Sequence, residues 1–131
     1  NIEIETKIDE FTIRADRLRF DELIRNLLDN AVKYSQTVGK IVIEAKEKPK
    51  GFVQIKIIDN GIGMTQEQIS HIFEDFYRAD PKIHDFKSSG LGMPICKKIV
   101  EKHGGKIWVE SQGLNKGTKI IFKIPLKEKK S

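Results

Sequence analysis

The sequence predicts an α+β fold in which one mixed β-sheet carries three helices on a single face, forming a two-layer sandwich. Segments with strand periodicity come in neighbouring pairs, and helical segments separate these pairs. The strict alternation of strands and helices that a doubly wound sheet requires is absent from the pattern. The 131 residues suit one domain, which we place at residues 1–126, and we expect the charged tail 127–131 to be disordered.

The composition narrows the class of protein. Apolar residues make up 38% and charged residues 33% of the chain, as in a soluble globular domain, and no run approaches the roughly 18 apolar residues of a membrane span. Cys96 is the only cysteine, which excludes an intramolecular disulfide and a four-cysteine zinc site. The net charge of +5 comes from lysines mixed with glutamates and from the tail, so we predict no nucleic-acid binding.

The first half of the chain contains four predicted strands and one long helix. Alternating apolar and polar residues predict short strands at residues 2–5 and 11–14. Asp16 is a candidate N-cap, and the helix after it ends near residues 35–39. Its apolar face comprises Phe20, Leu23, Ile24, Leu27, Leu28 and Ala31. Strands at 40–46 and 52–58 follow, joined by a turn at 48–51.

The second half alternates helices with a long irregular segment. Thr65 and Gln68 form a candidate capping box for a short helix that ends near Phe73. Residues 76–90 show no apolar period, and a loop of that length is usually functional or disordered. A helix with Pro94 in its first turn then runs to Gly104–Gly105, and we interpret His103 as a cation at its C-terminal end. Strands at 106–111 and 118–125 complete the order.

A polar stripe follows the first helix beside its apolar face. Asn26, Asn30 and Lys33 fall within roughly 60° of one another around the helix axis. Asparagine is a poor helix former, about half a kcal/mol worse than alanine, so two on one line need a reason. One reading is a row of amide oxygens and a cation that faces a metal-bound polyphosphate. The alternative is a helix surface that is polar without further purpose.

The stretch Ile57-Ile58-Asp59-Asn60-Gly61-Ile62-Gly63-Met64 changes from an apolar strand to an acid and two glycines. A carboxylate at the end of a buried strand can accept a hydrogen bond from an exocyclic amine and so select a base. The glycines permit positive φ and leave no Cβ in the way of a ligand. The alternative is an ordinary turn, since Asp, Asn and Gly are common turn residues.

A third candidate is the stretch from Ser88 to Met93, which leads into a helix N-terminus. Free backbone N–H groups and the helix dipole favour a phosphate at such a junction. The chain has no Walker A sequence and no dinucleotide-binding glycine motif. The alternative is a glycine-rich helix start that binds no ligand.

Together and in this order, these segments resemble the catalytic and ATP-binding domain of sensor histidine kinases, in the superfamily of the gyrase, Hsp90 and MutL ATPases. The resemblance covers residues 11–125 and implies a Bergerat-type ATP-binding fold with ATP and Mg²⁺ as cofactors. The matching segments are Asn26–Ser35 (N box), Asp59–Gly63 (G1 box), Ile72–Arg78 (F box), Ser89–Gly92 (G2 box) and Lys116–Thr118 (the closing Gly-Thr element).

The resemblance assigns catalytic and metal-binding roles to four residues. It implies that Asn30 is the principal Mg²⁺ ligand and that Asn26 assists it. Lys33 would approach the phosphates, and Arg78 would stabilise the charge on the γ-phosphate during transfer. Asn30, Lys33 and Arg78 are therefore the expected catalytic residues.

The resemblance also assigns the nucleotide pocket. Tyr34 would line it, Asp59 would accept a hydrogen bond from the adenine amine, and Thr118 would support the adenine through water. Gly61 and Gly63 would shape the pocket floor.

A lid over the phosphates is implied as well, formed by Ser89, Gly90, Leu91 and Gly92. Two residues depart from the family pattern at this lid. Ser88 stands where glycine is usual, and Pro94 stands where a small residue is common. Both departures put the flexibility of the lid in question.

The implied function is transfer of the γ-phosphoryl group of Mg-ATP to a histidine on a separate dimerisation and phosphoacceptor domain of the same protein, in two-component signal transduction. None of His71, His84 and His103 lies in a phosphoacceptor context, so we expect this chain to be a monomeric fragment of a homodimeric parent. A response regulator would be an indirect partner. We expect a cytoplasmic location, which includes the cytoplasmic part of a membrane-anchored sensor. The alternatives are a non-catalytic nucleotide-binding sensor or docking module and a serine-directed kinase or ATPase of the same superfamily.

Overall fold

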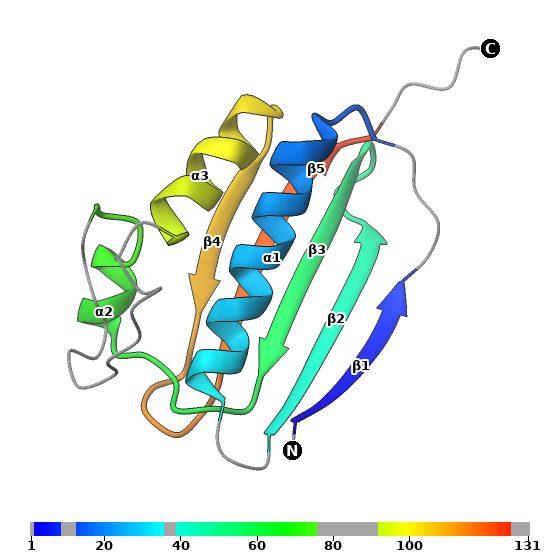
Figure 1. Ribbon diagram of the computed structural model, residues 1–131. Helices are drawn as coiled ribbons and strands as arrows, with labels where there is room; N and C mark the ends of the chain where they lie inside the picture. Colours follow the sequence, from blue (N-terminus) through cyan, green and yellow to red (C-terminus); the bar gives the residue numbers. More distant parts are fainter. Residues whose placement is uncertain (1, 9–12, 36–38, 76–91, 127–131) are drawn as a thin grey trace.

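The computed structural model describes residues 2–8, 13–35, 39–75 and 92–126 (Figure 1). Five strands form one sheet in the order β1-β2-β3-β5-β4, and α1 and α3 pack side by side on one face of it (Figure 1). This arrangement confirms the predicted α+β sandwich with a mixed sheet. The elements are β1 (Ile2–Ile8), α1 (Arg17–Tyr34), β2 (Gly39–Glu47), β3 (Phe52–Asp59), α2 (Gln66–His71), α3 (Gly92–Lys102), β4 (Lys106–Glu110) and β5 (Thr118–Pro125).

The first strand does not pair as predicted. We expected β1 to lie beside a strand at 11–14, but β1 pairs in parallel with β2 across α1, with Ile4 opposite Ile41. Residues 9–12 lie outside the described part of the chain, and Ile13 makes an isolated bridge with Leu126. The prediction of neighbouring pairs was wrong here because alternating polarity shows which side chains are buried and does not identify the partner strand.

The start of α1 is fixed by two contacts. The Asp16 carboxylate accepts hydrogen bonds from the backbone N–H groups of Leu18 and Arg19, which confirms the predicted N-cap. The backbone N–H of Asp16 itself donates to Nε2 of His103 at 3.0 Å, and Nδ1 of the same ring lies 2.7 Å from the carbonyl oxygen of Ile99. A ring nitrogen that accepts a hydrogen bond carries no proton. His103 is therefore neutral in this arrangement, and its interpretation as a cation was wrong.

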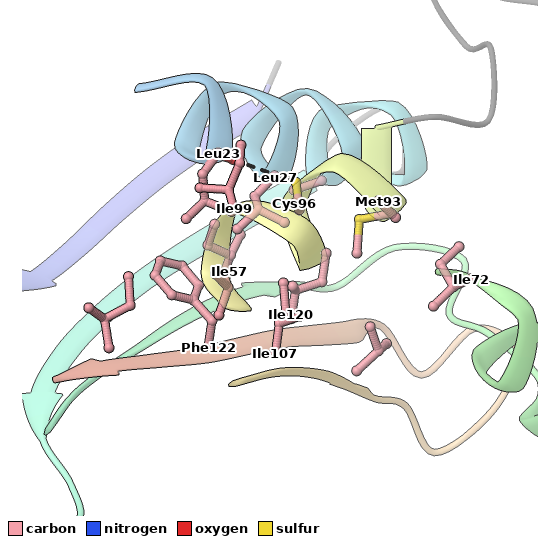
Figure 2. Packing of buried hydrophobic residues seen from close by; sticks show 14 of the residues in the cluster. Leu23, Leu27, Ile57, Ile72, Met93, Cys96, Ile99, Ile107, Ile120 and Phe122 are labelled. Atoms are coloured by element: carbon pink, nitrogen blue, oxygen red, sulfur yellow. Dashed lines mark hydrogen bonds between the residues drawn. The ribbon is translucent and has the colours of Figure 1, made fainter. Parts of the chain in front are cut away.

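The core lies between the helices and the sheet. Leu23 and Leu27 of α1 are fully buried and belong to one core with Ile57 of β3 and Phe122 of β5 (Figure 2). Val100 of α3 belongs to the same core. Odd-numbered residues of β3 and even-numbered residues of β5 face this core, as their cross-strand pairing requires. Close packing of this kind supplies most of the free energy that holds the helices on the sheet.

The short helix α2 begins as predicted. Thr65 and Gln68 form a reciprocal capping box, and Ile72 at the C-cap belongs to the same core as α1 and α3. Phe73 follows, and the Lys97 ammonium of α3 lies 5.9 Å from its ring centroid. The charged tail at 127–131 lies outside the described residues, and no helix within them is long and apolar enough to cross a membrane.

We expect Leu27→Ala to lower the free energy of unfolding by about 2–5 kcal/mol, because Leu27 is fully buried and its loss leaves a cavity under α1. Leu18→Ala is the matched control on the same helix. Its side chain is 80% exposed, so the change should stay within about 0.5 kcal/mol. Urea denaturation followed by circular dichroism measures both, and similar losses in the two variants would contradict this packing.

Candidate functional site

The candidate site lies where β3 ends, beside the C-terminal end of α1 and the turn between β4 and β5. Asp59 is the last residue of β3, points to the helix-covered side of the sheet and is only 6% exposed. Its Oδ1 accepts a hydrogen bond from the backbone N–H of Gly61 at 2.9 Å. Burial raises the pKa of this carboxyl, while the backbone N–H groups of Gly61 and Thr118 oppose that shift. The result is a desolvated hydrogen-bond acceptor held in a fixed position.

The end of α1 contacts the turn that follows Asp59. The Ile62 backbone N–H donates to the carbonyl oxygen of Tyr34 at 3.1 Å. A Cβ at Gly61 would overlap the same carbonyl oxygen, and a Cβ at Gly63, where φ is +70°, would overlap the carbonyl oxygen of Gly113. We predicted that these glycines make room for a ligand. The structure gives them a further reason, which is the close approach of three backbone segments.

The turn between β4 and β5 contributes residues that the sequence analysis did not single out. The Ser111 hydroxyl donates to the carbonyl oxygen of Gly117 at 2.7 Å and accepts from the Met64 backbone N–H at 3.1 Å. The Asn115 backbone N–H donates to the carbonyl oxygen of Ile62 at 2.7 Å. A cluster of Ser, Gly and Asn between two strands indicates a turn, but the sequence carries no signal for the segment that the turn contacts.

The polar stripe of α1 leads to the same place. Asn26, Asn30 and Lys33 are half-buried, and Asn30 precedes Tyr34 by about 6 Å along the helix axis. The Lys33 ammonium lies 5.3 Å from the ring centroid of Tyr34. The stripe therefore runs down α1 and ends where Tyr34 contacts the turn at Gly61.

Asn26 also lies at the contact between α1 and α3. Burial raises the pKa of the Cys96 thiol to about 12, and a hydrogen bond from the Asn26 side chain opposes part of that shift. The thiol is fully buried, and its sulfur lies 3.9 Å from the carbonyl oxygen of Leu23 (Figure 2). A thiol in this environment is unreactive and serves the packing of the two helices.

The side chains of the candidate site can be compared with the ligands that a metal ion requires. Among the described residues, no group of three or more His, Cys, Asp or Glu side chains is placed to hold one. The oxygen donors of the polar stripe are instead the amides of Asn26, in the middle of α1, and of Asn30, about one turn before its end. Mg²⁺ accepts such oxygen ligands and usually keeps several waters beside substrate phosphates. The site thus fits an Mg²⁺ ion that arrives with a polyphosphate.

The predicted site residues separate into four groups. Asn26, Asn30 and Lys33 form the polar stripe of α1. Asp59, Gly61, Gly63 and Thr118 lie together with the end of α1, where Tyr34 sits. Gly92 is the first residue of α3 and is exposed. The remaining predicted residues lie outside the described part of the chain: Arg78, Ser89, Gly90 and Leu91.

Comparison with known proteins gives one family and a consistent set of relatives. The family described as histidine kinase-, DNA gyrase B- and HSP90-like ATPases matches residues 15–128. The methanogenesis regulatory histidine kinase FilI of Methanothrix harundinacea is 41% identical over 114 residues, which are 86% of this chain and 12% of that protein. Sensor protein RprX of Bacteroides fragilis is 41% identical over 116 residues, 87% of this chain and 22% of that protein. The chain thus spans less than a quarter of the length of these two relatives.

Solved structures agree with this fold. A mycobacterial sensor histidine kinase, MprB, superposes with a TM-score of 0.86 at 28% identity, covering 98% of this chain and 86% of that one. Full-length ShkA in complex with AMPPNP gives 0.83 at 27% identity, covering 99% and 27%. Histidine kinase ThkA in complex with the response regulator protein TrrA gives 0.75 at 30% identity, covering 96% and 34%.

We expect Gly61→Ala to destabilise the protein by about 2 kcal/mol or more, because the added Cβ overlaps the Tyr34 carbonyl and forces α1 away from the turn. Gly92→Ala is the control, since a Cβ there meets nothing within 4 Å and its φ is not positive. Thermal unfolding of the two variants compares them. Equal melting temperatures for Gly61→Ala and wild type would show that the close contact is not needed.

Proposed function

The chain belongs to the family of histidine kinase-, DNA gyrase B- and HSP90-like ATPases, and from that premise we propose that it binds Mg-ATP and transfers the γ-phosphoryl group to a histidine on another domain. The observation that carries the proposal is the buried Asp59 carboxylate beside the docked end of α1. The relatives named as histidine kinases support the choice of acceptor.

Asp59 would select the base. A carboxylate that is nearly inaccessible to water has a strong demand for hydrogen-bond donors. The exocyclic amine of adenine offers such a donor, whereas the carbonyl of guanine at the same position is an acceptor and would be repelled. Tyr34, Gly61 and Gly63 would form the surroundings of the base, and Thr118 would support it through water.

The stripe on α1 would hold the phosphate end of the nucleotide. We assign Asn30 as the principal ligand of Mg²⁺, Asn26 as its assistant and Lys33 as a cation beside the phosphates. When bound, Mg²⁺ neutralises phosphate charge and orients the terminal phosphoryl group. Arg78 is proposed to stabilise the transferring group, and Ser89, Gly90, Leu91 and Gly92 to cover the phosphates. The relative ShkA in complex with AMPPNP supports a nucleotide ligand.

The acceptor histidine would belong to another domain. Within the described residues, His103 is held between the Asp16 backbone and Ile99, and His71 pairs with Glu74 at 2.8 Å. Both imidazoles thus already have partners within the described residues. We therefore propose a dimerisation and phosphoacceptor domain of the same protein as the direct partner, within a homodimeric, cytoplasmically oriented parent. The ThkA complex with a response regulator supports a regulator as the next recipient.

We expect Asp59→Asn to weaken Mg-ATP binding by about a hundredfold while the fold is kept. The Asn oxygen can retain the hydrogen bond from Gly61, which leaves an amide N–H₂ facing the adenine amine, donor against donor. Calorimetric titration measures affinity, and circular dichroism reports the fold. Asp21→Asn, an exposed site on α1, is the control and should bind like wild type. Unchanged affinity in Asp59→Asn would contradict this role, and residues 57–64 would then be an ordinary turn.

We expect Asn30→Ala to abolish most phosphotransfer, by about a hundredfold or more, because it removes the proposed metal ligand. The assay supplies γ-labelled ATP and a separate histidine-bearing helical hairpin, and it follows label on the hairpin. Arg25→Ala, exposed on the same helix, should label it normally. The Mg²⁺ dependence of ATP affinity should also flatten in Asn30→Ala. If wild type labels the hairpin no better than Asn30→Ala, the catalytic assignment fails.

A further inference from the structure

Strand β1 forms one edge of the sheet and carries two exposed apolar side chains. The sheet order begins with β1, and among the described residues only β2 pairs with it along its length (Figure 1). Ile4 and Ile8 are 54% and 58% exposed. Ile4 lies opposite the fully buried Ile41, so both isoleucines face the same side of the sheet as the helices. Strand β1 lies beyond the area that α1 and α3 cover, which leaves these side chains in contact with water (Figure 1).

The other edge of the sheet is covered. Ile107 and Val109 of β4 face the core and are only 7% and 8% exposed, since α3 packs on this strand. A free sheet edge pairs readily with another strand, and natural proteins usually block it with a covering element, a proline or charged side chains. Of these devices, the described residues of β1 have only the charges of Glu3, Glu5 and Lys7. The order of these charges therefore decides which strand can pair with β1.

The side chains of β1 are arranged so that the strand complements itself about Thr6. Glu5 and Lys7 adjoin Thr6 in the chain and point to the far face of the sheet. Ile4 and Ile8 lie two residues from Thr6 in either direction and point to the helix side. In an antiparallel pair centred on Thr6, each Glu5 lies opposite Lys7 of the second copy. Each Ile4 likewise lies opposite Ile8 of the second copy. Opposed pairs of unlike charge stabilise two adjacent strands, and so do opposed β-branched side chains that become buried.

The neighbouring registers lack this complementarity. A two-fold axis perpendicular to the sheet passes through one residue of β1, because directly opposed residues share a face. Centring the pair on Glu5 or on Lys7 places that residue opposite its own copy, which brings like charges together. Centring it on Ile4 brings Glu3 against Glu5 of the second copy. Like charges in opposed positions destabilise the pair, so the register about Thr6 is favoured.

The charges of β2 beside Glu5 and Lys7 fit the same register. Glu5 forms a salt bridge with Lys40 at 2.9 Å, and Lys7 lies opposite Glu44. Strand β2 lies on one side of β1 and the second copy would lie on the other, so these neighbours are kept. Across the two copies, the order Glu44, Lys7, Glu5 and Lys40 alternates in sign. An acidic or a basic strand from another protein would meet a like charge at Glu5 or Lys7, whereas a second copy meets none there.

We propose that β1 pairs antiparallel with β1 of a second copy of this chain, with the two-fold axis at Thr6, so that the two sheets become one. The helices of both copies then lie on the same side of the joined sheet, because an axis perpendicular to the sheet preserves its faces. Ile4 and Ile8 pack on Ile8 and Ile4 of the second copy and lose their contact with water. The paired segment is short and buries less than the roughly 1,200 Å² of a standard interface. We therefore expect a weak dimer, with a dissociation constant on the order of 0.1 mM.

The pairing uses no residue of the candidate site. Strand β2 lies between β1 and β3, so Asp59 keeps its neighbours when a second copy is added. The inference goes beyond the proposed phosphotransfer and is tested without nucleotide. In the homodimeric parent proposed above, linkage of the two copies raises their effective concentration to roughly the millimolar range, where the pair forms. That last step alone rests on the proposed function.

The first experiment measures the oligomeric state by sedimentation. Wild type should change from monomer to dimer as its concentration rises from roughly 10 µM to roughly 1 mM. Ile8→Lys should weaken dimerisation about tenfold or more, because it places a cation against Ile4 of the second copy. Circular dichroism checks that this variant keeps its fold. Leu18→Lys is the matched control, since it adds the same charge at an apolar residue of α1 that is 80% exposed, and it should dimerise like wild type. A monomer at the highest concentration, or equal dimerisation of the two variants, would overturn the proposal.

The second experiment tests the position of the axis by disulfide cross-linking. Opposed Cα atoms of an antiparallel pair lie about 4.5–5.5 Å apart, which a disulfide can bridge. Under mild oxidation, Thr6→Cys should therefore form a linked dimer several-fold faster than Leu18→Cys, which reports random collisions. Cys96 is fully buried, so wild type should stay unlinked. Equal rates for Thr6→Cys and Leu18→Cys would overturn the proposal and leave the edge of β1 to a strand of a different protein.

The same chemistry tests the register on either side of Thr6. Ile4 is opposed to Ile8 of the second copy, so a mixture of Ile4→Cys and Ile8→Cys chains should link several-fold faster than either variant alone. Linking of Ile4→Cys alone that is as fast as that of the mixture would overturn the register about Thr6.

Discussion

The docking of the C-terminal end of α1 against the turn after β3 is the contact on which the site depends. The Tyr34 carbonyl accepts the Ile62 N–H, and the absence of a Cβ at Gly61 lets the two segments approach. This contact sets the distance between the polar stripe of α1 and the Asp59 carboxylate. The nucleotide that we propose as the ligand would have to span that distance to reach both groups.

Several parts of this arrangement can be predicted because their causes are local. The N-cap at Asp16, the capping box at Thr65 and the acid at the end of β3 each depend on residues within a few positions. The partner of β1 and the neutral state of His103 cannot be predicted in this way. Both result from segments far apart in the sequence, since β1 pairs across α1 and His103 follows the Asp16 that it contacts by 87 residues.

In the candidate site, too, the features with local causes can be predicted from the sequence, and those that depend on distant segments cannot. Its chemistry-bearing residues, such as Asn30 and Asp59, are recognisable because their residue types are costly in a helix interior or at a buried strand end. Ser111 has no such cost, because a hydroxyl in a turn is ordinary. Its importance appears only when its bonds to Met64 and Gly117 are seen to join two turns. The candidate ligand-binding groups can therefore be named from the sequence, whereas the groups that hold them in position are found only in the structure.

Strand β3 brings these considerations together. Most of its residues are buried or half-buried by the strands and helices around it, and such a strand is expected to be apolar throughout. Within the described residues, Gln54 and Asp59 are its buried polar exceptions, and they face opposite sides of the sheet. Asp59 receives backbone hydrogen bonds, whereas Oε1 of Gln54 receives none. For the carboxylate of Asp59 we propose a further hydrogen-bond donor from outside the fold, the exocyclic amine of adenine, and this proposal gives a reason for an acid at the end of a buried strand.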